Sequence, residues 1–408
     1  MAAAVMLVFA ANADAGPVVR GRSASRLTTQ AGNAAVSGSS IRKAAAGRAA
    51  VQSPETDLAA TLTPAQLAGQ RVIYSYSGLT PPSALLRLIR HGEVGGVIFF
   101  ASNFSNTAQF NAAVATLVAN NSLAQNPAHN FPLLLMTDQE GGQVRRLPGA
   151  PVLSEKQIGS LPTPAQRAAA ATAAGSGAGQ NLLSHGLNLN LAPVLDVFRT
   201  PGNFIDQFGR SYSMNPVTVS RLGSLFITAQ QATGVAATAK HFPGLGAAAR
   251  GQNTDLVPVT IRLSKATIQS VDEAPFAAAI AAGVKLIMVS WARYPNLGSA
   301  RPAGLSSVIV QGQLRNRLGF TGITITDAIG AGALVNNGSI QNRSLLAAQA
   351  GMQLILTSSL TEASQALAGL QTGFNNGSLS QSAFRANVAQ ILTLRSGLPD
   401  PTIGFGRA

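Results

Sequence analysis

Eight short apolar runs recur along the chain, and they constrain its fold more than any other feature. Each run is rich in leucine or β-branched residues and almost free of charge, as expected of a strand buried on both faces in a parallel sheet. The runs are RVIYSYS (71–77), VGGVIFF (94–100), PLLLMTD (132–138), LNLNLAPVLDV (187–197), VAATAKHF (235–242), VKLIMVSW (284–291), GITITDA (322–328) and MQLILT (352–357).

Stretches with helical character separate these runs, and four of them end at a glycine, namely Gly92, Gly186, Gly234 and Gly283. A glycine directly after the last helical residue is a typical C-terminal cap. Eight strands that alternate with helices over about 300 residues predict a (β/α)8 TIM-like barrel. A doubly wound open sheet is the alternative. We expect one catalytic domain over residues 57–408.

The segment before this domain, residues 1–56, is rich in Ala, Ser, Gly and Arg and has no sustained period. We expect a leader and a disordered linker. Its start, MAAAVMLVFAANADAG, resembles the apolar core and small-residue cleavage site of a secretory signal, although the positive segment is missing. We expect a secreted or envelope-associated protein, with the cytoplasm as the alternative. No stretch reaches the roughly 20 uncharged apolar residues of a membrane span.

The amino-acid composition argues against several classes of function. The chain has no cysteine, which excludes disulfides, thiolate metal ligands and a thiol nucleophile. Its four histidines lack the spacing of a zinc site, so we expect no metal and no cofactor. The net charge is +14, but the basic residues are scattered, which favours general attraction to an anionic surface over specific nucleic-acid binding. We expect a monomer.

Charged residues stand at the ends of several apolar runs, in a chain with only 15 acidic residues. Asp138, Asp196 and Asp327 end or nearly end the third, fourth and seventh runs, and Lys240 and His241 lie at the end of the fifth. In a (β/α)8 barrel the active residues lie at the carboxyl ends of the strands. Buried or rim carboxylates also need partners or water. The sequence therefore predicts a charged barrel mouth.

One stretch matches the glycine pattern of a dinucleotide-binding motif but not its context. Residues 244–249 fit G-x-G-x-x-A, and Asp272 lies near the distance expected for the ribose acid. However, Lys240 and Pro243 stand where an apolar strand end is expected, and RGQNTD follows in place of a long helix. We therefore predict no nucleotide site here.

Several motifs in order are similar to those of glycoside hydrolase family 3. They are DQEGG (138–142), HGLNLNLAPVLDV (185–197), FGRSYSMNP (208–216), KHFPG (240–244), PFAAAIAAGVKLIMVS (275–290), RPAGLSS (301–307) and GFTGITITDA (319–328). The most similar branch is that of the β-N-acetylhexosaminidases that release N-acetylglucosamine from peptidoglycan fragments. The resemblance extends from about residue 60 to about residue 360 and implies a TIM-like barrel. It also implies β-glycoside cleavage with retention, through a covalent glycosyl-enzyme.

The resemblance also implies roles for individual residues. Asp327, in ITITDA, would be the nucleophile; the alternative is an aspartate that caps the next helix. The family's sugar-binding positions match Asp138, Arg146, Arg210, Lys240 and His241. The alternatives are a structural ion pair between Asp138 and Arg146, and a hydrogen-bonded core histidine at His241.

The segment KHFPGLGAAARGQNTD departs from this branch. The branch usually has Lys-His-Phe-Pro-Gly-His-Gly and, further on, Asp-Ser-His, whose last histidine is the general acid/base. Here Leu245 replaces the first histidine, and the later position reads Asn253-Thr254-Asp255. Asp255 could replace the acid/base if burial raises its pKa or if the enzyme works at acidic pH. The alternatives are a weak or inactive sugar binder, and an acid supplied from elsewhere.

A second departure is Trp291, where the family commonly has a histidine after the sixth strand. A tryptophan at a barrel mouth can stack on a sugar, and the alternative is packing under a loop. We predict a retaining exo-acting β-N-acetylglucosaminidase that acts on glycans such as peptidoglycan fragments. The alternatives are a β-glucosidase-type exo-glycosidase of the same family and a catalytically weak carbohydrate-binding relative.

Overall fold

The computed structural model describes residues 53–400. Most of the expected leader, and the last eight residues, lie outside this range. Helix α1 spans Pro54–Thr61, a range that includes the predicted boundary at residue 57. Ser53 caps this helix by accepting a hydrogen bond from the backbone N–H of Thr56, and acidic residues occupy its first turn, where they complement the helix dipole.

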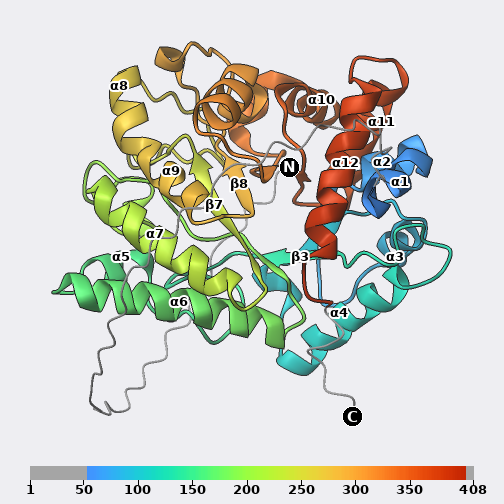
Figure 1. Ribbon diagram of the computed structural model, residues 1–408, viewed down its shortest axis with the longest axis horizontal. Helices are drawn as coiled ribbons and strands as arrows, with labels where there is room; N and C mark the ends of the chain where they lie inside the picture. The colour runs from blue at the N-terminus through green and yellow to red at the C-terminus, as the bar shows by residue number, and fades with distance from the viewer. Residues whose placement is uncertain (1–52, 401–408) are drawn as a thin grey trace, which may run out of the picture. The chain divides into compact units, whose positions relative to one another are not determined.

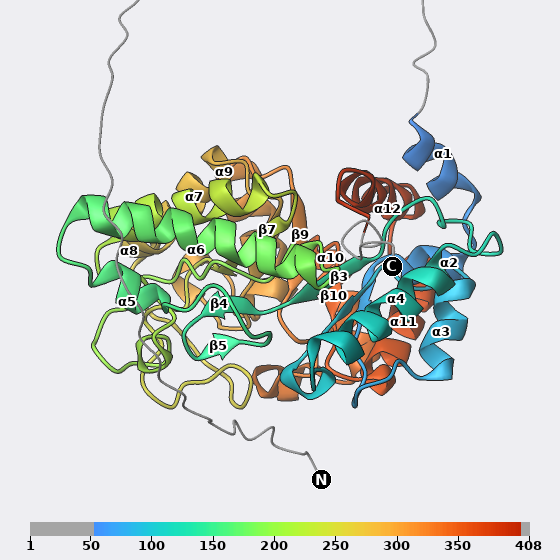
Figure 2. The same cartoon turned by 90° about the horizontal axis from the view of Figure 1, so that it is seen from below.

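A sheet of eight strands forms the centre of the molecule (Figures 1 and 2), and every predicted apolar run contains one of them. The strands are β1 (Val72–Tyr74), β2 (Gly96–Ile98), β3 (Leu134–Thr137), β6 (Leu189–Asn190), β7 (Ala236–Phe242), β8 (Leu286–Val289), β9 (Ile323–Thr326) and β10 (Ile355–Leu356). Their order is β10-β1-β2-β3-β6-β7-β8-β9, and all neighbours are parallel.

The sheet closes between its first and last strands. Ile325 and Leu354 form a parallel bridge, and the N–H of Thr326 donates to the carbonyl of Leu354 at 3.0 Å. The predicted (β/α)8 barrel is thus confirmed, and the alternative of a doubly wound open sheet is wrong.

Helices surround the barrel. The α-helices after α1 are α2 (Pro64–Gly69), α3 (Ser83–Arg90), α4 (Thr107–Asn121), α5 (Glu155–Gly159), α6 (Pro164–Ser184), α7 (Pro216–Gln231), α8 (Lys265–Thr267), α9 (Ala274–Ala281), α10 (Ile340–Ala350), α11 (Leu360–Asn375) and α12 (Gln381–Ser396). The 3-10 segments are η1 (Ala101–Asn103), η2 (Asp206–Phe208), η4 (Pro295–Leu297), η5 (Ala303–Leu305) and η7 (Gly332–Asn337), and the π-helical ones are η3 (Ile268–Asp272) and η6 (Val308–Arg317).

Small residues let the outer helices approach each other closely. In Figures 1 and 2, α6 and α7 lie side by side. A Cβ atom on Gly175 of α6 would lie 2.3 Å from the carbonyl oxygen of Phe226 on α7, so this contact requires glycine. The four glycines predicted to end helices all have positive φ, between 70° and 96°.

Helix α12 closes the barrel at the amino ends of its strands. Ile391 of α12 belongs to the apolar cluster inside the barrel, and Leu394 and Leu398 pack against that cluster. Arg395 fixes the helix there by donating hydrogen bonds to the carbonyls of Phe131 and Pro132, just before β3. Within residues 53–400, no helix is both long and apolar enough to cross a membrane.

At the opposite end, two long loops join each other over the barrel mouth. The segment after β7 contacts the segment after β9 through two backbone hydrogen bonds. The N–H of Gly332 donates to the carbonyl of Asp255 at 2.7 Å, and that of Ala333 donates to the carbonyl of Thr254 at 3.0 Å. A small antiparallel hairpin, β4 (Gln139–Gly141) and β5 (Val144–Arg145), follows β3 at the same end.

Candidate active site

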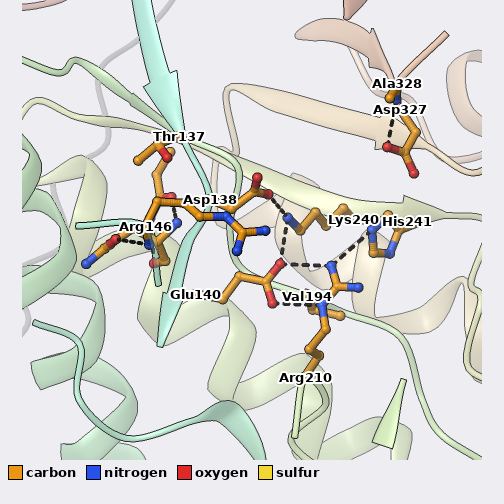
Figure 3. A network of polar contacts seen from close by, with 12 residues as sticks. Thr137, Asp138, Glu140, Arg146, Val194, Arg210, Lys240, His241, Asp327 and Ala328 are labelled. Atoms are coloured by element: carbon orange, nitrogen blue, oxygen red, sulfur yellow. Dashed lines mark hydrogen bonds and ion pairs between the residues drawn. The ribbon is translucent and has the colours of Figure 1, made fainter. Parts of the chain in front are cut away.

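The predicted charged mouth is present at the carboxyl ends of the strands. Asp138 directly follows β3, Lys240 and His241 lie near the end of β7, and Asp327 directly follows β9. Arg210 joins them from the long segment after β6. Asp138 and Lys240, which are 102 positions apart in the sequence, meet in a network that also includes Arg210 and His241, whereas Asp327 lies apart from it and is hydrogen-bonded to Ala328 (Figure 3).

The network consists of two cations and two carboxylates. The Nζ atom of Lys240 lies 2.6 Å from Asp138 Oδ1 and 2.7 Å from Glu140 Oε1. Glu140 also accepts two hydrogen bonds of 2.9 Å from the guanidinium of Arg210, in the bidentate geometry typical of an Arg–carboxylate pair. The Lys240 and Glu140 side chains are each only 2% exposed, so these ion pairs are shielded from water.

These pairs keep all four groups ionised. Burial would raise the pKa of Glu140, but Arg210 and Lys240 outweigh it and lower that pKa to about 2. Burial likewise opposes ionisation of Asp138, whose pKa is nevertheless held below its usual value by Lys240 and Arg146. For Lys240, burial would lower the pKa, but Asp138 and Glu140 raise it above its usual value. The network therefore holds fixed charges and does not exchange protons.

His241 is held by a carboxylate behind the network. Its Nδ1 atom lies 2.7 Å from Asp196 Oδ2, and the other Asp196 oxygen accepts the backbone N–H of Leu245. Because Asp196 is the acceptor, the Nδ1 atom of His241 carries a proton, and the Nε2 atom faces Arg210 at 3.5 Å. His241 is thus a buried, hydrogen-bonded histidine that borders the network.

Arg146 reaches the mouth without a fixed partner. Its backbone N–H donates to Gln139 Oε1 at 3.1 Å, but its buried Nε atom has no hydrogen bond within the described residues. The structural ion pair considered between Asp138 and Arg146 is not formed, because Lys240 is the partner of Asp138. The outer nitrogen atoms of Arg146 also form no side-chain hydrogen bond within residues 53–400, so they, and not the enclosed Nε atom, are the donors left for a ligand.

Asp327 is half-buried, and the next residue, Ala328, is held by hydrogen bonds at both its N–H and its carbonyl. The N–H of Ala328 donates to Asp327 Oδ1 at 2.7 Å, while the Ala328 carbonyl accepts a 2.9 Å hydrogen bond from the indole N–H of Trp291. Trp291 is only 1% exposed. This burial favours the packing alternative for Trp291 over stacking on a sugar.

Asp255 lies on the loop that contacts the segment after β9, and it is exposed at the surface although protein groups crowd around its carboxylate. The loss of bulk water around it and the negative charge of Asp327 raise the pKa of Asp255 to about 6, although Arg210 and His241 act in the opposite direction. Arg250, which could have lowered this pKa, is exposed and forms no ion pair among the described residues.

The glycines of the imitated dinucleotide motif pack against the protein itself. A Cβ atom on Gly246 would lie 2.0 Å from the carbonyl oxygen of Val197, and the Gly246 carbonyl accepts hydrogen bonds from Arg199 and Asn203. Asp272 pairs with Arg199 at 2.6 Å. The motif therefore leaves no room for a pyrophosphate, in agreement with the prediction.

Sequence reasoning did not assign a role to two residues of this site, Glu140 and Asp196. Both were visible as acids at or just after strand ends, which is the signal that could have placed them. Their functions are to hold Lys240 and Arg210 in place and to orient His241.

Comparison with known proteins identifies relatives along most of the chain. The family model described as glycosyl hydrolase family 3 N terminal domain matches residues 65–394. A protein of Arthroderma benhamiae named "Uncharacterized secreted glycosyl hydrolase" is 46% identical over 336 residues, which are 81% of this chain and 93% of the relative.

Two solved structures are similar as well. The family 3 β-N-acetylglucosaminidase of Paenibacillus sp. has a TM-score of 0.77 at 32% identity, and the match covers 85% of this chain and 64% of that one. The β-N-acetylhexosaminidase of Beutenbergia cavernae has a TM-score of 0.74 at 30% identity, over 83% of this chain and all of that one.

A closed (β/α)8 barrel with carboxylates and paired cations at its mouth, together with these relatives, defines a glycoside hydrolase. Because the family model covers most of its length, the chain belongs to glycosyl hydrolase family 3.

Proposed function

We propose that this protein is a retaining exo-glycosidase that hydrolyses terminal β-linked N-acetylglucosamine. The observation that carries the proposal is that two carboxylates with different environments, Asp327 and Asp255, lie at the mouth of the barrel, where the charge of Asp327 raises the pKa of Asp255. The names of the Paenibacillus and Beutenbergia relatives support the choice of sugar.

In the first step, Asp327 attacks the anomeric carbon and forms the glycosyl-enzyme. Asp255 donates its proton to the glycosidic oxygen as that bond breaks. In the second step, the resulting Asp255 carboxylate takes a proton from water, and the water oxygen attacks the anomeric carbon and releases Asp327. A pKa of about 6 suits both roles, because Asp255 is then readily present in either protonation state.

The fixed network binds the sugar. Asp138 is 16% exposed, so its carboxylate can accept hydrogen bonds from sugar hydroxyls. Arg210, also 16% exposed, and Arg146 can donate to hydroxyl or acyl oxygens. Lys240 and His241 are buried. In this proposal Lys240 holds Asp138 in place, and His241 holds Arg210.

We propose that the reaction takes place in a single catalytic domain, which consists of residues 57–408 together with the rest of α1. We also propose that the protein acts outside the cytoplasm. Support for export is the name of the Arthroderma relative, which contains the word secreted. Peptidoglycan fragments remain the proposed substrate class, and the net charge of +14 is compatible with an anionic wall.

The direct test compares nitrophenyl β-N-acetylglucosaminide with nitrophenyl β-glucoside on the wild-type protein. We expect clear release of nitrophenol from the N-acetylglucosaminide and much less from the glucoside. A preference for the glucoside would indicate a β-glucosidase. If neither substrate is turned over but N-acetylglucosamine still raises the melting temperature, the protein is a carbohydrate-binding relative without activity. The replacement of the family's acid/base histidine by Asp255 is the reason for including this outcome.

Trp291 provides a further prediction, because its indole N–H fixes Ala328 next to the proposed nucleophile. Trp291→Phe keeps an aromatic ring but removes the donor. We expect kcat to fall about tenfold with little change in KM, since a loosened nucleophile is less well oriented for attack.

Tyr74→Phe serves as the control, because it removes a buried hydroxyl on β1 that has no hydrogen-bond partner within residues 53–400 and makes no contact with Ala328 that could orient Asp327. Its kcat should equal that of the wild type. If Trp291→Phe lowers only the melting temperature, or if it raises KM and leaves kcat unchanged, the positioning role is wrong.

A further inference from the structure

A cavity lies at the end of the barrel opposite to the proposed active site. It has a volume of about 670 Å³ and is lined by residues of η6, by the end of α10, by the segments before β1, β9, β10 and α12, and by α12 as far as Gln390. This volume is within the range of small-molecule sites. Arg71 and Arg315 both line it.

Arg71 is a buried cation whose hydrogen-bonding capacity is only partly used. It is 1% exposed, and its guanidinium lies 4.2 Å from the ring centre of Phe384. The Nε atom donates to the carbonyl of Gln353 at 3.0 Å and Nη2 donates to that of Met352 at 2.7 Å. Nη1 makes no hydrogen bond within the described residues, and it is not among the buried atoms that are sealed off without a partner. Nη1 is therefore open to the cavity.

Arg315 is held in a similar way from the other side. Its Nη1 atom donates to the carbonyls of Phe320 and Gly322, and Nη2 donates to Gln353 Oε1 at 2.7 Å. Gln353 thus connects the two arginines, with its carbonyl bound to Arg71 and its side chain bound to Arg315. The two guanidinium groups are fixed relative to each other before any ligand arrives.

Neither arginine has an acidic partner. The ion pairs formed among residues 53–400 include neither Arg71 nor Arg315, whereas the buried cations of the mouth are all paired with carboxylates. Burial without a compensating carboxylate lowers the pKa of Arg71 to about 9 and that of Arg315 to about 10. Both groups are still cations at neutral pH, so the cavity has an uncompensated positive charge.

The rest of the lining fits a polar ligand with an acidic group. The first turn of α12, a helix of 16 residues, borders the cavity, and although the Ala383 N–H is already capped by the hydroxyl of Ser380, the positive end of the helix dipole favours an anion there. The amide and hydroxyl side chains of Gln349, Ser378, Asn387 and Gln390 also line it. Such groups bind the hydroxyls of a sugar better than an apolar body.

We propose that this cavity binds a sugar-sized anion, a sugar that carries a phosphate or a carboxylate, through Arg315 and Arg71. This site is separate from the proposed active site, and it stands or falls independently of the proposed glycosidase activity. Its ligand is held by charge-assisted hydrogen bonds at its acidic end and by neutral polar groups along its body.

Calorimetric titration tests the proposal on the full chain, with glucose 6-phosphate, glucuronate, inorganic phosphate and neutral glucose as probes. We expect one of the two sugar anions to bind and glucose not to bind. Which of them binds more tightly distinguishes a phosphate from a carboxylate. If inorganic phosphate binds as tightly as the sugar anions, the sugar-sized part of the proposal is wrong. If no anion binds, the whole proposal is wrong.

Two variants locate the bound probe. Arg315→Gln should weaken binding by about tenfold or more, because it removes one charged partner. Asn387→Phe, which fills the cavity without changing a charge, should also abolish binding and is useful if Arg315→Gln is unstable. Arg221→Gln on the exposed surface of α7 removes the same charge elsewhere and should leave binding unchanged. Unchanged binding in both cavity variants would overturn the proposal, because the anion would then bind elsewhere.

Discussion

Asp327→Ala is expected to lower turnover of nitrophenyl β-N-acetylglucosaminide by at least about 10³-fold, because it removes the carboxylate that we propose as the nucleophile. Asp327 directly follows β9, and its carboxylate is oriented by the N–H of Ala328 at 2.7 Å. Removal of this side chain leaves the ion network around Glu140 intact, so substrate binding should survive. The measurement is the rate of nitrophenol release, together with the initial burst that reports one turnover per active site.

Azide provides the decisive control for this variant. A small anionic nucleophile can enter the space left by the carboxylate and attack the anomeric carbon from the same face. The activated substrate should then yield an α-glycosyl azide and nitrophenolate. Asp57→Ala, an exposed acid on α1, should retain full activity. Substantial turnover of Asp327→Ala without azide would mean that another residue is the nucleophile.

Asp255→Asn is expected to have the second largest effect, and this effect should depend on pH and on the leaving group. The raised pKa of about 6 means that Asp255 is protonated below that pH and ionised above it. Bond cleavage needs the protonated form, so wild-type kcat/KM on a substrate with a poor leaving group should fall as the pH rises through about 6. The asparagine cannot donate a proton, and this decline should disappear.

The size of the loss in kcat/KM on each substrate shows whether Asp255 is the general acid or only a structural residue. Loss of general acid catalysis should lower kcat/KM by about 10²- to 10⁴-fold for an unactivated N-acetylglucosaminide. The loss should be much smaller for the nitrophenyl substrate, whose leaving group needs little protonation. Asp57→Asn is the matched control on the surface. An equal loss on both substrates, or an unchanged pH profile, would assign the acid to a different residue.

The barrel was predictable because its signal is local. Each of the eight strands lies inside a short apolar run, and such runs are visible without knowledge of their neighbours. Lys240 and Asp138 were placed at the mouth by the same logic, since the carboxyl ends of all strands meet there. The ordered motifs of the family then limited the function to a glycosidase.

The pairing inside the site was not predictable, because it depends on contacts between distant segments. The sequence could not say that Lys240, rather than Arg146, neutralises Asp138, since the three lie on separate strands or loops. The environment of Trp291 was left open for the same reason, because only the folded loops decide whether its ring is covered.

The contact between the loops after β7 and β9 has a consequence for how such an enzyme can evolve. The two loops are joined through main-chain atoms of Thr254, Asp255, Gly332 and Ala333, so the identity of the side chain at position 255 does not affect the joint. In the proposed mechanism, the proton donor at position 255 can therefore be exchanged between a carboxylate and an imidazole without breaking these main-chain hydrogen bonds. Such an exchange would change the pH range of activity and leave the ion network around Glu140 untouched, because that network contains neither position 255 nor the two loops.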